Sequence, residues 1–67
     1  MKHTVRRMQN QIIDKCEPHG HTIVNGLIVE KYLNNKTNET FEIVYDYDTT
    51  PVRITNLTTG QTIERDS

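Results

Sequence analysis

The sequence contains no tryptophan, no alanine, a single cysteine and no long apolar run. A lone cysteine cannot form an internal disulfide, and this usage is typical of proteins in a reducing compartment. No segment approaches the length of about 20 apolar residues that a membrane-spanning helix requires. The basic residues near Met1 are not followed by the apolar segment of a signal peptide. We therefore expect a cytoplasmic protein that makes no membrane contact.

The chain is short, with 67 residues. A chain of about 60 residues buries only about 60% of its unfolded surface, so its stability is marginal. This size predicts a single small domain over residues 1–67, without room for a large cofactor pocket, and no cofactor is expected. Pairing with a second copy would enlarge the core, so the sequence leaves a homodimer open.

The charged residues nearly balance, with a formal net charge of -1 at pH 7. So small a net charge creates no general attraction to nucleic acid or to an anionic membrane. The absence of alanine, together with many Ile, Asn, Lys and Thr residues, is typical of AT-rich genomes. The composition thus indicates a low-GC bacterium or one of its phages as the source.

Residues 41–48 are predicted to form the central strand, because aromatic or aliphatic side chains alternate with acidic ones along them. We expect the aromatic face to be covered by a helix, since it carries too much apolar area to remain in water. The acidic face is then left outside. The aromatic face comprises Phe41, Ile43, Tyr45 and Tyr47, and the acidic face comprises Glu42, Asp46 and Asp48 with Val44 among them.

The covering helix is predicted to begin at Thr4, as its cap, and to end at about Lys15 or Cys16. Apolar residues recur there at steps of three and four, which is typical of a helix with one buried face. The polar residues, Gln9 among them, are expected to cover the exposed surface. Glu17, Pro18, His19 and Gly20 are predicted to form the turn that ends the helix. The apolar stripe consists of Val5, Met8, Ile12 and Cys16, widened by Ile13.

Residues 22–34 are rich in β-branched side chains and are predicted to be extended. Asn25-Gly26 in their middle favours a β-hairpin with a type I′ turn. One long strand with a glycine bulge at Gly26 is the alternative. In the hairpin we expect three apolar residues to face the core, with Glu30 and Tyr32 facing outward. These three are Leu27, Val29 and Leu33.

The remaining segments complete an antiparallel meander. A polar loop over residues 34–38 precedes the central strand, and Pro51 marks the turn after it. A further strand is expected to end at about Leu57, and Gly60 is expected in a hairpin loop with left-handed geometry before an edge strand over residues 62–65. The predicted fold class is α+β: an N-terminal helix packed on a four- to five-stranded antiparallel meander, with a small, partly open barrel as its most curled form.

One segment, residues 16–21, combines a cysteine with two histidines. Thiolate and imidazole groups bind zinc, but structural zinc sites use four protein ligands, and the second ligand pair is missing. Cys16 with His19 or His21 as a base also lacks the orienting group and pocket of a nucleophilic enzyme. We therefore predict neither a metal site nor an enzyme.

The sequence is best interpreted as a small non-enzymatic binding or regulatory protein that acts through protein contacts. The acidic strand face, with an outward Tyr32 beside it, offers a surface for a basic protein partner. One form of this hypothesis is an inhibitor that imitates phosphate charge and blocks a nucleic-acid enzyme. The residues predicted to bind the partner are Tyr32, Glu42, Val44, Asp46 and Asp48.

Nucleic-acid binding is the alternative function. Four basic residues lie at or near the N-terminal helix, and a basic helix face can contact phosphates. The acidic residues of the central strand and the lack of net positive charge weaken this hypothesis. Its predicted contact residues are Lys2, Arg6, Arg7 and Lys15.

Overall fold

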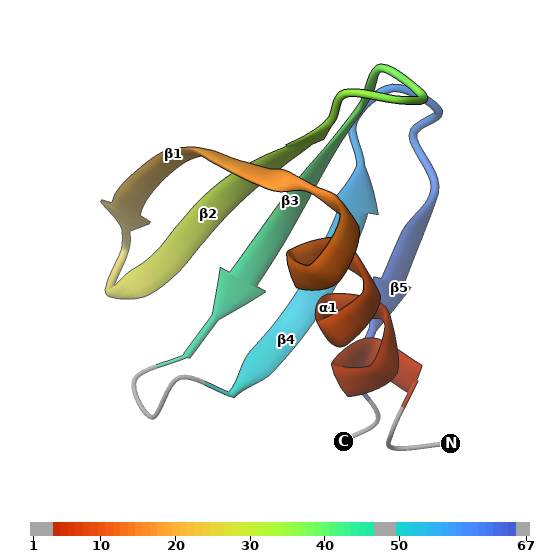
Figure 1. Ribbon diagram of the computed structural model, residues 1–67. Coiled ribbons are helices and arrows are strands. Elements are labelled where there is room, and N and C mark those ends of the chain that lie inside the picture. The colour runs from red at the N-terminus through yellow and green to blue at the C-terminus, as the bar shows by residue number, and fades with distance from the viewer. Residues whose placement is uncertain (1–3, 47–49, 66–67) are drawn as a thin grey trace.

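The computed structural model describes residues 4–46 and 50–65. One helix, α1 (Thr4–Lys15), packs on an antiparallel sheet whose strands lie side by side in chain order (Figure 1). The predicted helix on a meander is thereby confirmed, and within the described residues β1 and β5 do not pair, so the sheet is not closed into a barrel. The strands are β1 (Glu17–Val24), β2 (Leu27–Asn34), β3 (Glu39–Tyr45), β4 (Pro51–Asn56) and β5 (Thr62–Glu64).

Helix α1 buries the predicted stripe, with Val5 and Ile12 in the core and Met8 and Cys16 packed against it. Two of its residues depart from expectation. Ile13 is about half exposed, because it lies beyond the packed face of the helix. Gln9 was expected in solvent but is buried; its spacing of four from Val5 and three from Ile12 places it on the packed face.

The core lies between α1 and one face of the sheet, called here the helix-side face; the opposite face is the outer face. Phe41, Ile43 and Tyr45 all point toward the helix, as predicted, while Tyr47 lies outside the described residues. Ile43 and Ile54 are neighbours in register and are the largest fully buried side chains. Both belong to one core cluster with Val5 and Ile12 of α1, and α1 lies over this part of the sheet (Figure 1), so β3 and β4 form the centre of the fold.

The hairpin predicted at residues 25 and 26 is confirmed. Asn25 and Gly26 have φ values of 52° and 80°, as a type I′ turn requires, and they join β1 directly to β2. The turn predicted over residues 17–20 is wrong. Strand β1 starts at Glu17, and a register shift between Pro18 and Gly20 accommodates the proline within the strand.

The predicted orientation of β2 is also wrong. Tyr32 pairs with Phe41 and is buried on the helix-side face, whereas Leu27 and Val29 lie on the outer face. The pairing with β3 decides this orientation, because directly opposed residues share a face. Tyr32 therefore belongs with the aromatic face of β3, and Leu33, opposite Thr40, belongs to the outer face.

The C-terminal part agrees closely with expectation. Strand β4 ends at Asn56, and Gly60 has a φ of 85° in the loop before β5. Strand β5 is short and ends at Glu64. Within the described part of the chain, no helix has the length and apolar character needed to cross a membrane.

Candidate functional site

The outer face of the sheet includes the strand face that was predicted to bind a partner, and α1 leaves it uncovered (Figure 1). Glu42 and Val44 both lie on this face. Glu42 stands opposite Lys31, and Val44 stands opposite Arg53, which in turn faces Glu64. Charges of opposite sign thus lie on neighbouring strands, an arrangement that favours the sheet. The outer face has mixed charge and is not purely acidic.

An apolar cluster occupies the hairpin end of the outer face and is called here the outer-face cluster. It consists of Val24, Leu27, Val29 and Val44. Val24 is 50% exposed, whereas Val44 lies between Val29 and Arg53 and is only 3% exposed. The cluster lines a groove of about 460 Å³ that is bordered by Lys31, Glu42 and Arg53. An apolar centre with a charged border is the general composition of a protein interface.

The other residues predicted for this surface lie elsewhere or are engaged. Tyr32 is on the helix-side face, and Asp48 is outside the described residues. The carboxylate of Asp46 accepts hydrogen bonds from Arg65 Nη1 and from the Thr50 amide, each at 3.3 Å. Arg65 therefore offsets part of the negative charge expected at this end of β3.

A second groove, of about 390 Å³, lies on the helix-side face between α1 and the β1–β2 hairpin. Polar side chains from the helix and the sheet meet in it. Gln9 Nε2 donates to the Tyr45 hydroxyl at 3.1 Å, and the Tyr32 hydroxyl donates to Glu30 Oε1 at 2.9 Å. The imidazole of His21 approaches the other oxygen of Glu30 at 3.8 Å. Arg6 and Ile13 form the helix wall of this groove.

The groups in this second groove are arranged to hold the fold together. Burial raises the pKa of Tyr45 and, together with the hydrogen bond to Glu30, the pKa of Tyr32. Both phenols therefore stay protonated at neutral pH and are not nucleophiles. Among the described residues, no buried side-chain nitrogen or oxygen lacks a hydrogen-bond partner. A satisfied network of this kind fixes one packing arrangement.

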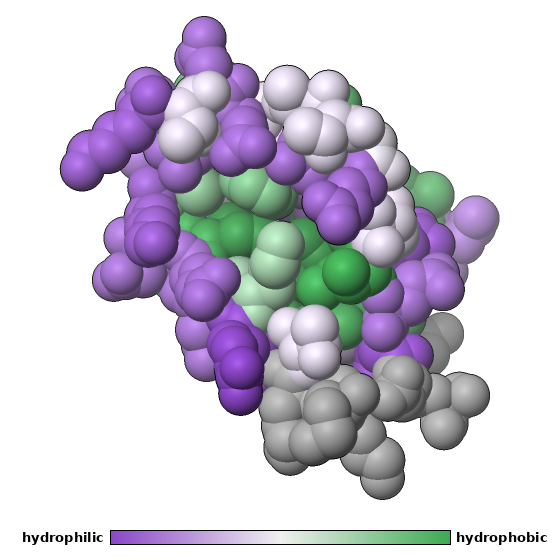
Figure 2. All heavy atoms as spheres, turned by 90° about the vertical axis from the view of Figure 1, so that its right-hand side faces the viewer, coloured by the Kyte–Doolittle hydropathy of each residue, from purple (hydrophilic) through white to green (hydrophobic). Residues whose placement is uncertain are grey.

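A third apolar area lies between α1 and β5 (Figure 2), where hydrophilic side chains surround it. Met8, Ile12, Cys16 and Phe41 line one hollow there, of about 110 Å³, and Met8 and Ile63 line another of about 70 Å³. Both are far below the roughly 300 Å³ of a typical ligand pocket. Burial, and next the negative charge of Glu39, raise the pKa of the Cys16 thiol. Cys16 is therefore a protonated packing residue and a poor nucleophile.

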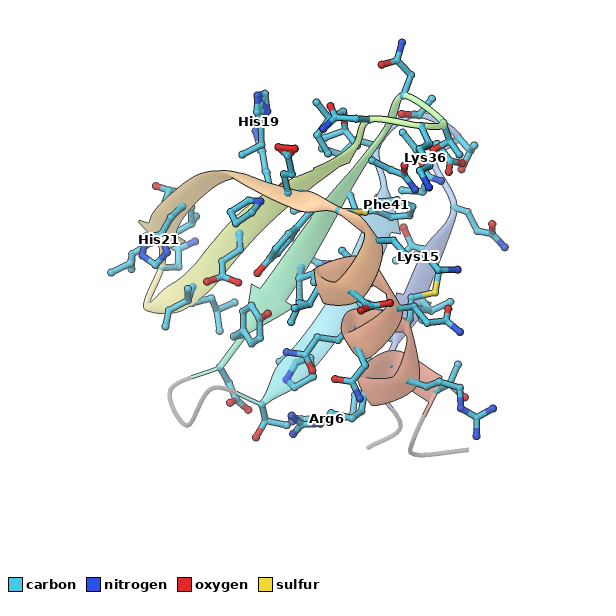
Figure 3. The ribbon with its side chains drawn as sticks, viewed as in Figure 1. Arg6, Lys15, His19, His21, Lys36 and Phe41 are labelled. Carbon is cyan, nitrogen blue, oxygen red and sulfur yellow. The ribbon has the colours of Figure 1, made fainter. Side chains whose placement is uncertain are left out.

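The basic residues of the alternative hypothesis do not gather on one surface. Arg6 and Lys15 lie near opposite ends of α1 and point away from each other (Figure 3). The nine-residue step from Arg6 to Lys15 corresponds to about two and a half helical turns, so these two side chains lie on opposite sides of the helix axis. Arg6 also donates to Gln9 Oε1 at 3.5 Å. Arg7 is exposed, and Lys2 lies outside the described residues.

The cysteine and the two histidines of residues 16–21 also diverge in space. Cys16 packs against the core, His19 points out from the top of β1, and His21 lies beside Glu30 (Figure 3). Over the residues that the structure describes, no three His, Cys, Asp or Glu side chains are placed to hold a metal ion.

The sequence did not reveal the outer-face cluster or the role of Gln9. Gln9 could have been recognised from its helical spacing, since Val5, Gln9 and Ile12 follow one stripe. The cluster could not, because it is formed by pairing between three strands. No family model, curated protein or solved structure matches the chain.

Proposed function

We propose that this protein is a non-enzymatic binding protein, and that a protein partner docks on the outer face of its sheet. The observation that carries the proposal is that α1 covers only one face, while the other presents an apolar cluster with charged side chains around it. The partner surface has complementary chemistry: an apolar centre, with acidic groups opposite Lys31 and Arg53 and a basic group opposite Glu42. Of the residues expected from the sequence to bind the partner, Glu42 lies at the border of this surface, and Val44, only 3% exposed, forms its floor.

The state of the reactive side chains supports a binding function rather than catalysis. Cys16 is a protonated thiol, and Tyr32 and Tyr45 are protonated phenols within a satisfied network. His21 approaches Glu30 at 3.8 Å and His19 points out from β1 (Figure 3), so neither histidine of the described residues is paired with the Cys16 thiol, which packs against the core. In its specific form, the proposal is a cytoplasmic regulatory protein or inhibitor that comes from a low-GC bacterium or from one of its phages.

The proposal is tested with two matched substitutions. Leu27→Glu places a charge in the outer-face cluster, and Ile13→Glu places the same charge on the helix, on the other side of the molecule. Wild-type protein is used to capture a partner from a low-GC bacterium, the partner is purified, and its dissociation constant is measured for each variant. Leu27→Glu should weaken binding at least tenfold, which is about 1.4 kcal/mol, because it places an unpaired charge at the apolar centre of the interface.

Ile13→Glu should leave the dissociation constant unchanged. Equal weakening by both substitutions, or none by Leu27→Glu, contradicts the proposed surface. A gel-shift titration at low salt covers the nucleic-acid alternative. Retardation of DNA or RNA that is lost with Arg6→Glu and Arg7→Glu and reversed by salt would replace the proposed function with that alternative.

A further inference from the structure

The regular part of the free edge of β1, residues 20–24, lacks the features that normally protect a sheet edge. Protein edges are usually kept short, charged or interrupted, because their unpaired backbone groups can pair with another chain. Strand β5, at the other edge, has three residues and ends in Glu64 followed by Arg65. Strand β1 has eight residues, all exposed, and its regular part over residues 20–24 contains no Lys, Arg, Asp or Glu. The two edges are therefore protected very differently.

The backbone groups that β1 leaves free follow from the hairpin register. Val24 and Leu27 flank a two-residue turn, so they exchange hydrogen bonds, and the bonded pairs continue with Thr22 and Val29. The alternate residues of β1, Ile23 and His21, direct their N–H and C=O groups away from β2. Strand β1 pairs with β2 alone within the described residues. The free edge thus offers two donors and two acceptors in the regular pattern of a strand.

The regular part of this edge is bounded on both sides. The register shift between Pro18 and Gly20 interrupts it at one end, and Pro18 has no N–H to donate. The turn at Asn25, with its positive φ, ends it at the other. Thr22 lies at the midpoint of the stretch between these limits. An antiparallel partner that uses the whole stretch must therefore be centred on Thr22.

We propose that two copies of this chain pair through β1, antiparallel and with Thr22 on the two-fold axis, to form one continuous sheet. In this register, His21 of each copy opposes Ile23 of the other, and the two residues exchange both of their free hydrogen bonds. Val24 of each copy opposes Gly20 of the other on the outer face. Two Thr22 side chains meet at the axis, a favourable cross-strand pair. The contact is closed by its symmetry, so it ends at a dimer.

The occupant is a second copy because the stretch is complementary to itself. It brings no like charges together, since residues 20–24 carry only glycine, histidine, threonine, isoleucine and valine. It covers Ile23, which is 66% exposed and is the most exposed large apolar side chain of the described residues. A 67-residue chain also gains a larger shared core by such pairing. Edge pairing extends the sheet without covering its outer face, and only Val24 of the outer-face cluster takes part in the contact, opposite the side-chain-free Gly20 of the other copy. The dimer can therefore hold or fail independently of the proposed function.

The register is tested by disulfide trapping in a Cys16→Ser background. Directly opposed residues of a non-hydrogen-bonded pair have Cα atoms about 4.5 Å apart, within the range that a disulfide spans. Thr22→Cys should therefore give a covalent dimer rapidly under mild oxidation. Val24→Cys is the matched control on the same face. Val24 opposes Gly20 of the other copy, so the two cysteines at position 24 are four strand residues apart, or about 13 Å, too far for a disulfide. The expected trapping rate of the control is at least tenfold lower.

Amide exchange and light scattering test the contact without added cysteines. Raising the protein concentration should slow amide exchange at His21 and Ile23, whose N–H groups bond to the second copy. Exchange at Thr22 and Val24 should not change, because the amides of these two residues are already bonded to β2. Ile23→Lys should shift the molar mass toward that of a monomer, whereas Leu57→Lys, at a second exposed apolar residue, should not. A wild-type monomer at millimolar concentration, equal trapping at both cysteine positions, or oligomers beyond the dimer would each overturn the proposal.

Discussion

Gln9 of α1 donates a hydrogen bond to the hydroxyl of Tyr45 in β3 at 3.1 Å, and both side chains are buried. The bond crosses a contact that is otherwise formed largely by apolar side chains, Val5, Ile12 and Ile43 among them. A buried amide without a partner is costly, whereas a partnered one restricts the packing to a single arrangement. The pair therefore fixes the rotation of the helix on the sheet as well as adding stability.

We expect Gln9→Leu and Tyr45→Phe each to lower the free energy of unfolding by about 1–3 kcal/mol, because each leaves the other polar group buried without its partner. The double variant removes both polar groups. It should lose less than the sum of the two single variants, with a coupling of about 1 kcal/mol. Urea denaturation of the four proteins measures the cycle. Strictly additive losses would show that the bond does not couple helix and sheet.

Stability should fall in alkaline solution because of the two buried tyrosines. Burial raises the pKa of Tyr45, and burial with the Glu30 hydrogen bond raises the pKa of Tyr32, both from an ordinary value of 10.0. The unfolded chain then releases these protons at lower pH than the folded one. Their contribution to stability is complete below pH 10 and is lost as the pH rises through the folded-state values.

Denaturant titrations between about pH 9 and pH 11 measure this loss, and tyrosinate absorbance follows the ionisation directly. Tyr32→Phe should flatten the dependence more than Tyr45→Phe, because Tyr32 has the larger shift and accepts no compensating bond from Gln9. If stability falls with pH as steeply in Tyr32→Phe as in the wild type, the phenol of Tyr32 ionises equally easily in the folded and unfolded chains, and the inferred pKa shift is wrong.

The sequence predicted the elements whose signals are local. The Asn25-Gly26 turn needs only two residues with positive φ, and the stripe from Val5 to Cys16 needs only a helical period. The aromatic face of β3 was equally clear, since its other face carries Glu42 and Asp46. In each case neighbouring residues along the chain contain the whole argument.

The orientation of β2 could not be decided in this way. Apolar residues occupy both faces of the strand, with Leu27 and Val29 on one and Ile28 and Tyr32 on the other. Alternation then gives no preference, and only the pairing of Tyr32 with Phe41 across the sheet selects the face. The outer-face cluster depends on that same pairing, so it was missed for the same physical reason.

The two glycines outside the hairpin turn should respond oppositely to alanine. Gly60 has a φ of 85°, and an added Cβ there meets no atom within 4 Å, so any cost comes from the backbone alone. Gly60→Ala should lower the free energy of unfolding by about 1–2 kcal/mol, since a side chain disfavours left-handed geometry. Gly60→Asn should cost less, because asparagine tolerates that geometry better.

Gly20 is the matched control within β1. A Cβ at this position would lie 3.8 Å from the Cβ of Lys31, an ordinary contact, and its φ is outside the left-handed region. Gly20→Ala should therefore raise the free energy of unfolding by about 0.4–1 kcal/mol, because alanine restricts the unfolded chain more than glycine does. Thermal or urea denaturation measures both substitutions. A loss at Gly20 as large as that at Gly60 would mean that the bulge beside Pro18 needs a glycine, and that the free edge of β1 is less regular than its pairing with β2 indicates.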